Sequence, residues 1–152
     1  AAPIIAAVTG HCTAGGMSLL SFCDLAIAAE DVEFGYPEAK KGQFPALALA
    51  MLIPMMPTKR AFDLLYTGDR FNAAEALALM LVNKVVPRAG VAAAVAEYVA
   101  AIKHLNPTAV ALGRKAFHAM VPMAPPQRLQ YAQTFLTTML LAEEAETRAR
   151  GG

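Results

Sequence analysis

A glycine pair followed further along by a carboxylate residue is the feature of this sequence best suited to chemistry. Gly15 and Gly16 stand between two apolar runs, so they mark a turn from a strand into a helix. The first N–H groups of a helix have no partner within it, and such donors bind phosphate or stabilise an oxyanion. Glu38 follows in the segment Phe34-Gly35-Tyr36-Pro37-Glu38. A donor turn with a carboxyl group nearby is compatible with enolate chemistry.

Two short strands and a helix would position these residues. The apolar run over residues 3–8 predicts a central parallel strand that is buried on both faces. A helix is expected over 15–22 and a second strand over 24–29, so the two strands are joined by a crossover and should be parallel. A third, shorter strand is expected over 32–34.

The remaining elements are mostly helices. Before residue 88 we expect, in order, a helix from Pro45 that ends or kinks at Pro54, a helix over 58–66 closed by Gly68, a helix capped by Asn72 with Glu75 in the capping-box position, and a strand over 82–86 ended by Pro87.

Beyond Pro87 the apolar spacing is helical throughout. Asn106-Pro107 has the pattern of an N-cap followed by proline in the first turn of a helix. The last helix carries an apolar stripe, which fits either ordinary core or a subunit contact: Leu129, Ala132, Leu136 and Met139. We therefore expect an α/β part over residues 1–87 and a helical oligomerisation region over residues 88–152.

The composition limits the class of protein. Apolar residues make up 57% of the chain and charged residues 16%, a surplus that indicates faces covered by a partner subunit or by further chain. The net charge of +1, with scattered basic residues, argues against a nucleic-acid partner. The longest apolar run, over 45–57, is interrupted by Pro54 and falls short of the ~18 residues of a membrane span. Cys12 and Cys23 have no metal or disulfide spacing, so we expect reduced, buried thiols and a cytoplasmic location.

Several familiar motifs fail on inspection. Gly10 and Gly15 have the opening spacing of a P-loop, but Gly16-Met17 stands where lysine and a hydroxyl residue are required. The three histidines are too far apart to suggest a zinc site, and no metal is expected.

Four motifs in the same order resemble the crotonase superfamily, also called the enoyl-CoA hydratase/isomerase family. They cover nearly the whole chain: Pro-Ile-Ile-Ala-Ala-Val-x-Gly-x-x-x-Ala-Gly-Gly…Cys-Asp-Leu-x-Ile-Ala over 3–28, Phe34-Gly35-Tyr36-Pro37-Glu38 with Gly42, the stretch from Thr67-Gly68 to Ala76, and the strand from Leu81 to Pro87. The resemblance implies an α/β fold with a spiral β-β-α core, present here in part and followed by C-terminal trimerisation helices. The chain resembles the C-terminal portion of a longer subunit, and this portion alone is expected to be inactive.

The resemblance also implies roles for individual residues. The N–H of Gly15 would be one donor of an oxyanion hole for the thioester oxygen of an acyl-CoA, and Glu38 would move the proton. The expected substrate-binding residues are His11, Ala14, Gly16, Ser18, Phe34, Pro37 and Phe44. Coenzyme A belongs to the substrate, no separate cofactor is expected, and the expected assembly is a homotrimer or a hexamer of two trimers.

Two departures from the family pattern leave the reaction open. Ser18 stands three residues after Gly15, where the two-carboxylate hydratases carry a second glutamate. Enoyl-CoA isomerases and some hydroxycinnamoyl-CoA hydratase/lyases resemble this single-glutamate arrangement, and a catalytically inactive CoA-ester binder is a further alternative. The stretch over 46–52 replaces the family's usual Gly-Gly-Thr-x-Arg-Leu, which changes the acyl pocket wall and is compatible with a medium-chain or aromatic acyl group.

Overall fold

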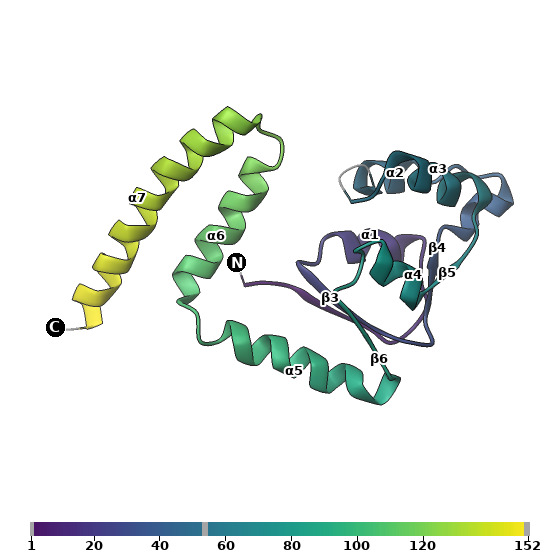
Figure 1. The fold of residues 1–152 in the computed structure, drawn as a ribbon, viewed down its shortest axis with the longest axis horizontal. Helices are drawn as coiled ribbons and strands as arrows, with labels where there is room; N and C mark the ends of the chain where they lie inside the picture. Colours follow the sequence, from purple (N-terminus) through teal and green to yellow (C-terminus); the bar gives the residue numbers. More distant parts are fainter. Residues whose placement is uncertain (1, 53–54, 151–152) are drawn as a thin grey trace. The chain divides into compact units, whose positions relative to one another are not determined.

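The computed structural model of this chain describes residues 2–52 and 55–150 of the 152. These residues form two compact units (Figure 1). One unit comprises residues 4–99 and holds both β-sheets. The other comprises residues 100–150 together with residues 2–3, and two long helices make up most of it.

The larger sheet consists of three parallel strands. Their order is β1 (Ile5–Val8), β3 (Leu25–Ala29) and β6 (Lys84–Val86). The helix α1 (Gly15–Ser21) lies in the crossover from β1 to β3, which confirms the predicted parallel pairing.

Among the described residues, the first strand is not the central one as expected. β3 is the middle strand of this sheet, while β1 pairs only with β3 among the residues described. The burial agrees with this order, because four of the five β3 residues are buried whereas Ala7 of β1 is exposed. Both strands are continuous apolar runs, so their sequences alone do not show which one is flanked on both sides.

A second, smaller sheet carries the segments around the glycine turn and Glu38. Its strands are β2 (Cys12–Thr13), β4 (Glu33–Gly35) and β5 (Phe71–Asn72), with β2 parallel and β5 antiparallel to β4. The third predicted strand thus exists, one residue later than expected, and it belongs to this separate sheet.

Helices surround these sheets within the unit. They are the 3₁₀ helix η1 (Pro37–Lys41), α2 (Ala46–Leu52), α3 (Thr58–Thr67), α4 (Ala73–Ala78), the 3₁₀ helix η2 (Arg88–Gly90) and α5 (Val91–Ile102), whose last three residues belong to the other unit. Pro54, predicted to end the helix from Pro45, lies outside the described residues.

Local signals in the sequence account for two helix ends. Gly68 closes α3 with a φ of +63°, a left-handed conformation that suits glycine. Asn72 caps α4 in a complete capping box: its Oδ1 accepts from the Glu75 N–H at 2.9 Å, and the Glu75 carboxylate accepts from the Asn72 N–H at 3.0 Å.

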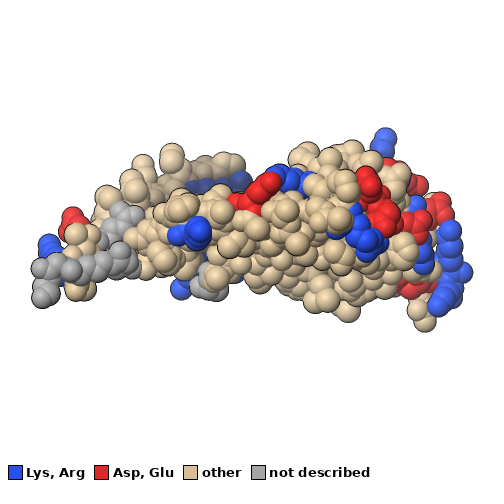
Figure 2. Space-filling view, turned by 90° about the horizontal axis from the view of Figure 1, so that it is seen from below, with Lys and Arg blue, Asp and Glu red and all other residues tan. Residues whose placement is uncertain are grey.

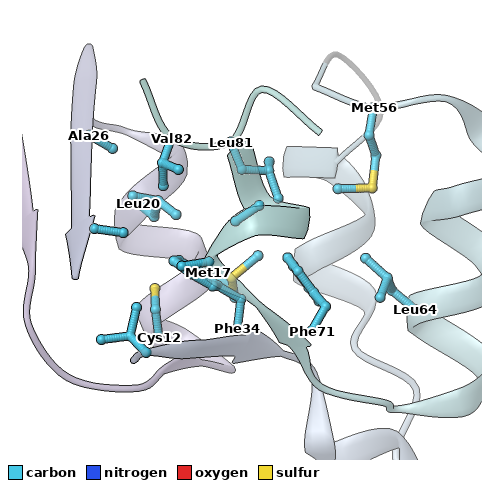
Figure 3. Close-up of a cluster of buried hydrophobic side chains, with 14 of the residues drawn as sticks. Cys12, Met17, Leu20, Ala26, Phe34, Met56, Leu64, Phe71, Leu81 and Val82 are labelled. Atoms are coloured by element: carbon cyan, nitrogen blue, oxygen red, sulfur yellow. The ribbon is translucent and has the colours of Figure 1, made fainter. Parts of the chain in front are cut away.

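The core of this unit lies between the two sheets and the helices that pack on them. Figure 3 shows Phe34 and Phe71 side by side near Met17, and the two rings stack with centroids 5.6 Å apart. Ile27 and Phe34 have no exposed surface, and complete burial of a large apolar side chain contributes roughly 1.5–3 kcal/mol. This packing fixes β4, and therefore the segment that follows it.

The second unit is built on α6 (Pro107–Met120) and α7 (Pro125–Arg150), which lie side by side (Figure 1). Asn106 caps α6 by accepting from the Thr108 and Ala109 N–H groups at 2.8 and 3.1 Å, as predicted. A groove of about 570 Å³ between the helices is lined by side chains that include Tyr131 and Phe135.

The predicted apolar stripe on the last helix divides between two environments. Ala132 and Met139 are half-buried, but Leu129 and Leu136 are 65% and 58% exposed, so these two leucines are not part of the core of this unit. The aromatic side chains that line the groove occupy the face toward α6 instead.

The surface carries mixed charge. Figure 2 shows acidic and basic side chains interleaved among large areas of other residues. Specific ion pairs include Arg88–Asp31 at 2.8 Å and Lys84–Glu97 at 2.7 Å. Across the described part of the chain, no helix combines the length and the apolar character that a bilayer crossing requires.

Candidate active site

The turn that leads into α1 has an unusual backbone. Ala14 adopts φ +49° and ψ −116°, a conformation that non-glycine residues seldom take and that costs about 1–3 kcal/mol. Its N–H donates to the Gly35 carbonyl at 3.0 Å, and its own carbonyl accepts from the Met17 N–H at 3.1 Å. The N–H groups of Gly15 and Gly16, which begin α1, have no acceptor among the described residues. The turn therefore presents two backbone donors that a ligand can use.

Glu38 lies in the single turn of η1, directly after β4. Its Oε2 atom is buried and has no hydrogen-bond partner within the described residues. A buried carboxylate oxygen without a partner is destabilising, so its presence indicates a group that receives its partner from outside the chain or from a rearranged neighbour. Gly42 ends η1 with a φ of +74°.

The pairing of β2 with β4 brings these two features together. Thr13 is in register with Gly35, and the strands are parallel. The segments that follow parallel strands leave the sheet at the same edge, so Gly15 and Glu38 both emerge beyond the carboxyl ends of their strands. The hydrogen bond from Ala14 to Gly35 ties the two segments at this edge.

His11 lies at the opposite end of β2. Its Nδ1 accepts from the Glu33 N–H at 3.1 Å, so the imidazole contacts the beginning of β4 rather than the edge where Glu38 emerges. With Gly16, His11 lines a separate cavity of about 290 Å³ beside β1 and α1. His11 thus shares a cavity with Gly16 of the glycine turn, while its own hydrogen bond is to the beginning of β4.

Phe34 is also set apart from any ligand. It is fully buried against Phe71, so its side chain supports the site from the core and has no free surface. Pro37 begins η1 and is half-buried, next to Glu38 in the chain. Ser18 is half-buried in the first turn of α1, where its N–H donates to the Ala14 carbonyl at 3.4 Å.

Phe44 belongs to an exposed aromatic group close to η1 in the chain. Its ring is 48% exposed and lies 6.1 Å from the ring of Tyr66, which in turn stacks on Phe62 at 5.2 Å. Leu47 of α2 is 85% exposed. Phe44 and Leu47 follow Glu38 closely in the chain, whereas Phe62 and Tyr66 belong to α3.

An exposed ion pair links η1 to the residue that follows the end of α3. Lys40 contacts Asp69 at 2.7 Å, and this lysine holds the pKa of the Asp69 carboxyl below its usual value. Gly68 lies so close that a Cβ at that position would come within 3.0 Å of the Lys40 side chain. The turn that carries Glu38 is thereby attached to the end of α3.

Tyr36 is a site residue to which the sequence assigned no role beyond its place in the segment that carries Glu38. It precedes η1, is 1% exposed, and its hydroxyl is the other buried side-chain polar atom without a partner in the described chain. Burial, with smaller contributions from the Glu38 and Cys12 charges, raises the pKa of Tyr36 to about 12. The signal available in the sequence was its position two residues before Glu38.

The two cysteines are free, as expected, but only one is fully buried. Burial, and secondarily the neighbouring Cys23, raises the pKa of Cys12 to about 11, while Cys23 itself is half-buried. In the described ranges no three side chains of His, Cys, Asp or Glu gather in a way that could hold a metal ion.

Known proteins resemble this chain in sequence. The family model described as enoyl-CoA hydratase/isomerase matches residues 1–150. The mouse mitochondrial protein named enoyl-CoA hydratase domain-containing protein 3 is 37% identical over 79% of this chain and 40% of its own length. A protein of Aspergillus fumigatus named mevalonyl-coenzyme A hydratase is 33% identical over 76% of this chain and 43% of its own length.

Solved structures agree with the sequence matches. The crystal structure of an enoyl-CoA hydratase from Mycobacterium smegmatis superposes with a TM-score of 0.88 at 30% identity, covering 91% of this chain and 54% of that one. The crystal structure of human enoyl-CoA hydratase domain-containing protein 3 gives a TM-score of 0.87 at 30% identity, covering 91% of this chain and 55% of that one. The chain thus spans less than half of the curated relatives named above and about half of these structures.

Proposed function

Because the chain belongs to the enoyl-CoA hydratase/isomerase family and has its crotonase fold, we propose that it carries part of an active site in which an acyl-CoA thioester passes through an enolate. The observation that carries this proposal is the buried, unpartnered Oε2 of Glu38, on the strand edge where Gly15 also emerges.

In this proposal Gly15 stabilises the oxyanion. The thioester oxygen gains negative charge when a proton leaves the neighbouring carbon, and a fixed N–H donor stabilises that charge more than the neutral carbonyl. Losing one such donor costs roughly 3 kcal/mol of barrier in comparable sites. The unusual Ala14 backbone supports this role, because it turns the chain so that the Gly15 N–H is left without an acceptor. Gly16 and Ala14 shape the same turn.

Glu38 is the proton carrier. A carboxylate that lacks a protein partner and is held on a short, anchored turn can accept a proton from the substrate and return it elsewhere. Pro37 and the core residue Phe34 hold this turn in place. The exposed Phe44 and its aromatic neighbours are suited to an apolar acyl group.

Ser18 favours isomerisation over hydration. A serine hydroxyl does not act as a base toward water at neutral pH without help, so Glu38 is the carboxylate available for the chemistry. In the isomerase reaction Glu38 takes the C2 proton of a 3-enoyl-CoA, giving a dienolate held at the Gly15 N–H, and returns a proton to C4. The product is the 2-enoyl-CoA, and no water is consumed.

Two alternatives remain distinct from this reaction. A hydroxycinnamoyl-CoA hydratase/lyase-like enzyme would add water to its substrate and then cleave a carbon–carbon bond. A family member that binds CoA esters without turnover would show neither change. The experiment below separates isomerisation from water addition and from binding without turnover.

The test measures the mass of the products that the full-length protein forms. Incubation with 3-enoyl-CoA should give the 2-enoyl isomer at unchanged mass, and Glu38→Gln should abolish this conversion while substrate binding persists. The exposed Glu30 is the matched control, and Glu30→Gln should leave turnover unchanged. Gain of water on 2-enoyl-CoA would replace isomerase with hydratase, and turnover that survives in Glu38→Gln would overturn the role of Glu38.

The helical region over residues 88–152 is proposed to form the contact of a homotrimer, or of a hexamer of two trimers. The exposed leucines of α7 support this assignment, since Leu129, Leu136 and Leu140 are all more than half exposed in their own unit. Native mass measurement distinguishes one, three and six subunits. The two free thiols favour a reducing compartment, of which the cytoplasm is one.

A further inference from the structure

We propose that Tyr36 is a positioning residue for Glu38, and that its phenol O–H donates a hydrogen bond to the Glu38 carboxylate in the reactive site. This inference rests on the proposed function, because it gives Tyr36 a part in the proton transfer by Glu38. The observation behind it is that two buried side-chain polar atoms lack a hydrogen-bond partner within the described chain. They are the Tyr36 hydroxyl and Glu38 Oε2.

The two unpartnered atoms are chemically complementary. A phenol supplies one O–H donor, and an ionised carboxylate oxygen is an acceptor. Each atom left alone in a buried place is destabilising, so one hydrogen bond between them removes two penalties at once. Because the acceptor is charged, this bond is shorter and stronger than one between neutral groups.

The backbone holds the two residues on one turn. Tyr36 precedes η1, and its carbonyl accepts from the Ala39 N–H at 3.2 Å, so this bond closes a turn that contains Glu38. The Tyr36 ring is 1% exposed and fixed by packing, and its O–H can take either of two orientations in the ring plane. As the side chains stand the two atoms are not bonded, so the proposed bond forms when the Glu38 carboxylate turns toward this anchored ring.

The electrostatics agree with this proximity. The Glu38 charge is among the causes that raise the pKa of Tyr36, second after burial. At neutral pH the phenol therefore keeps its proton and remains a donor. A hydrogen bond to a carboxylate favours the ionised form, which is the form that takes a proton from the substrate.

The other titratable groups near the turn are either paired with another residue or exposed to solvent. Lys40 of η1 pairs with Asp69 at 2.7 Å, and Lys41 is exposed at the end of the same turn. On the neighbouring α3, Tyr66 is exposed. Cys12 of β2 also contributes to the raised pKa of Tyr36, but sulfur is a weak hydrogen-bond acceptor compared with a carboxylate.

The test is Tyr36→Phe, which removes the hydroxyl and keeps the ring, in the protein as its whole gene encodes it. We expect kcat to fall about tenfold with little change in KM, since a hydrogen bond to a charged group is lost. We also expect the acidic limb of the kcat/KM–pH profile to move to higher pH, because the ionised carboxylate loses a donor. A purely structural tyrosine would not move that profile. Tyr98→Phe, at a half-buried tyrosine of α5, is the matched control and should leave the profile unchanged.

Glu38→Gln separates failure of this inference from failure of the proposed function. If Glu38→Gln abolishes turnover and Tyr36→Phe leaves both kcat and the pH profile unchanged, Tyr36 has no positioning role and the proposed function stands. If Glu38→Gln retains turnover, the proposed function and the positioning role of Tyr36 are both refuted.

A second measurement does not depend on the folding of Tyr36→Phe. With tyrosine labelled by ¹³C at Cζ, the Tyr36 signal should move as the pH is lowered through the range where carboxylates titrate. The same movement should disappear in Glu38→Gln. A Tyr36 signal that does not respond to pH in the unaltered protein would overturn the proposal.

Discussion

Substitution of Gly35 by alanine tests how the small sheet holds the two halves of the site. Gly35 ends β4 with a φ of +149°, and a Cβ built there would lie 2.9 Å from the Asp69 carbonyl oxygen and 3.3 Å from Arg70 Cα. Both neighbours are backbone atoms, so neither can swing away as a side chain would. Gly35→Ala therefore meets a strained conformation and a collision at the same time.

The size of the effect follows from these two contributions. A non-glycine residue in this region of φ costs about 1–3 kcal/mol, and overpacking against fixed atoms costs about 1–3 kcal/mol more. We expect the free energy of unfolding to fall by roughly 3–4 kcal/mol, a large part of the ~5–15 kcal/mol that stabilises a typical domain. The Gly35 carbonyl accepts from Ala14, so the same displacement should move the Gly15 donor relative to Glu38.

Two other glycines of the same unit serve as controls. Gly42 has a φ of +74° with open space around its Cβ position, so Gly42→Ala should show the conformational part alone, roughly 1–2 kcal/mol. Gly10 has open space and no positive φ, so Gly10→Ala should be neutral or slightly stabilising. The assay is urea unfolding followed by circular dichroism. A Gly35→Ala variant no less stable than Gly42→Ala would refute the collision argument.

Two further predictions concern the cap of α4 and the buried thiol. Asn72→Ala should lower the free energy of unfolding by about 1 kcal/mol in urea, whereas Asn72→Asp, which keeps the acceptor for the Glu75 N–H, should lose little; equal losses would contradict the capping role. The raised pKa of Cys12, about 11, means that the unfolded thiol ionises first as pH rises above about 9. Stability should therefore decline by roughly 2–3 kcal/mol between pH 9 and 11, and by less in Cys12→Ala; the same decline in both would exclude Cys12 as its source. At pH 8 the protonated Cys12 should also react more slowly with iodoacetamide than the half-buried Cys23.

The sequence predicted the elements whose signals are local. Apolar runs marked β1 and β3, the left-handed Gly68 ended α3, and Asn72 with Glu75 marked the start of α4. Each of these depends on residues within a few positions of one another. The overall fold was predicted from the family resemblance, because four separate motifs appear in the order in which the family has them.

The features that the sequence did not reveal depend on contacts between distant segments. β2 and β5 have only two residues each, too few for any periodicity, and they exist because β4 lies between them. The central place of β3 depends on which strands flank it. The exposure of Leu136 depends on which face of α7 the groove aromatics occupy.

The candidate site shows the same limit. Gly15 and Glu38 are identified by their motifs. In the structure, the parallel pairing of β2 with β4 places both beyond the same edge of the small sheet. The orphaned hydroxyl of Tyr36 was hidden, because burial and the absence of a partner are properties of the folded chain. The position of His11 at the far end of β2 likewise follows from register rather than from residue type.

The pairing of β2 with β4 also has a consequence for motion. This ladder joins two residues to two, Cys12 to Phe34 and Thr13 to Gly35, and the bond from Ala14 lies just beyond its end. Short ladders open at lower free energy than the body of a domain, so the two halves of the site can separate briefly while the larger sheet stays intact. The Ala14 amide hydrogen is released to solvent in each such opening, so its exchange rate reports the free energy of separating the donor turn from the glutamate turn.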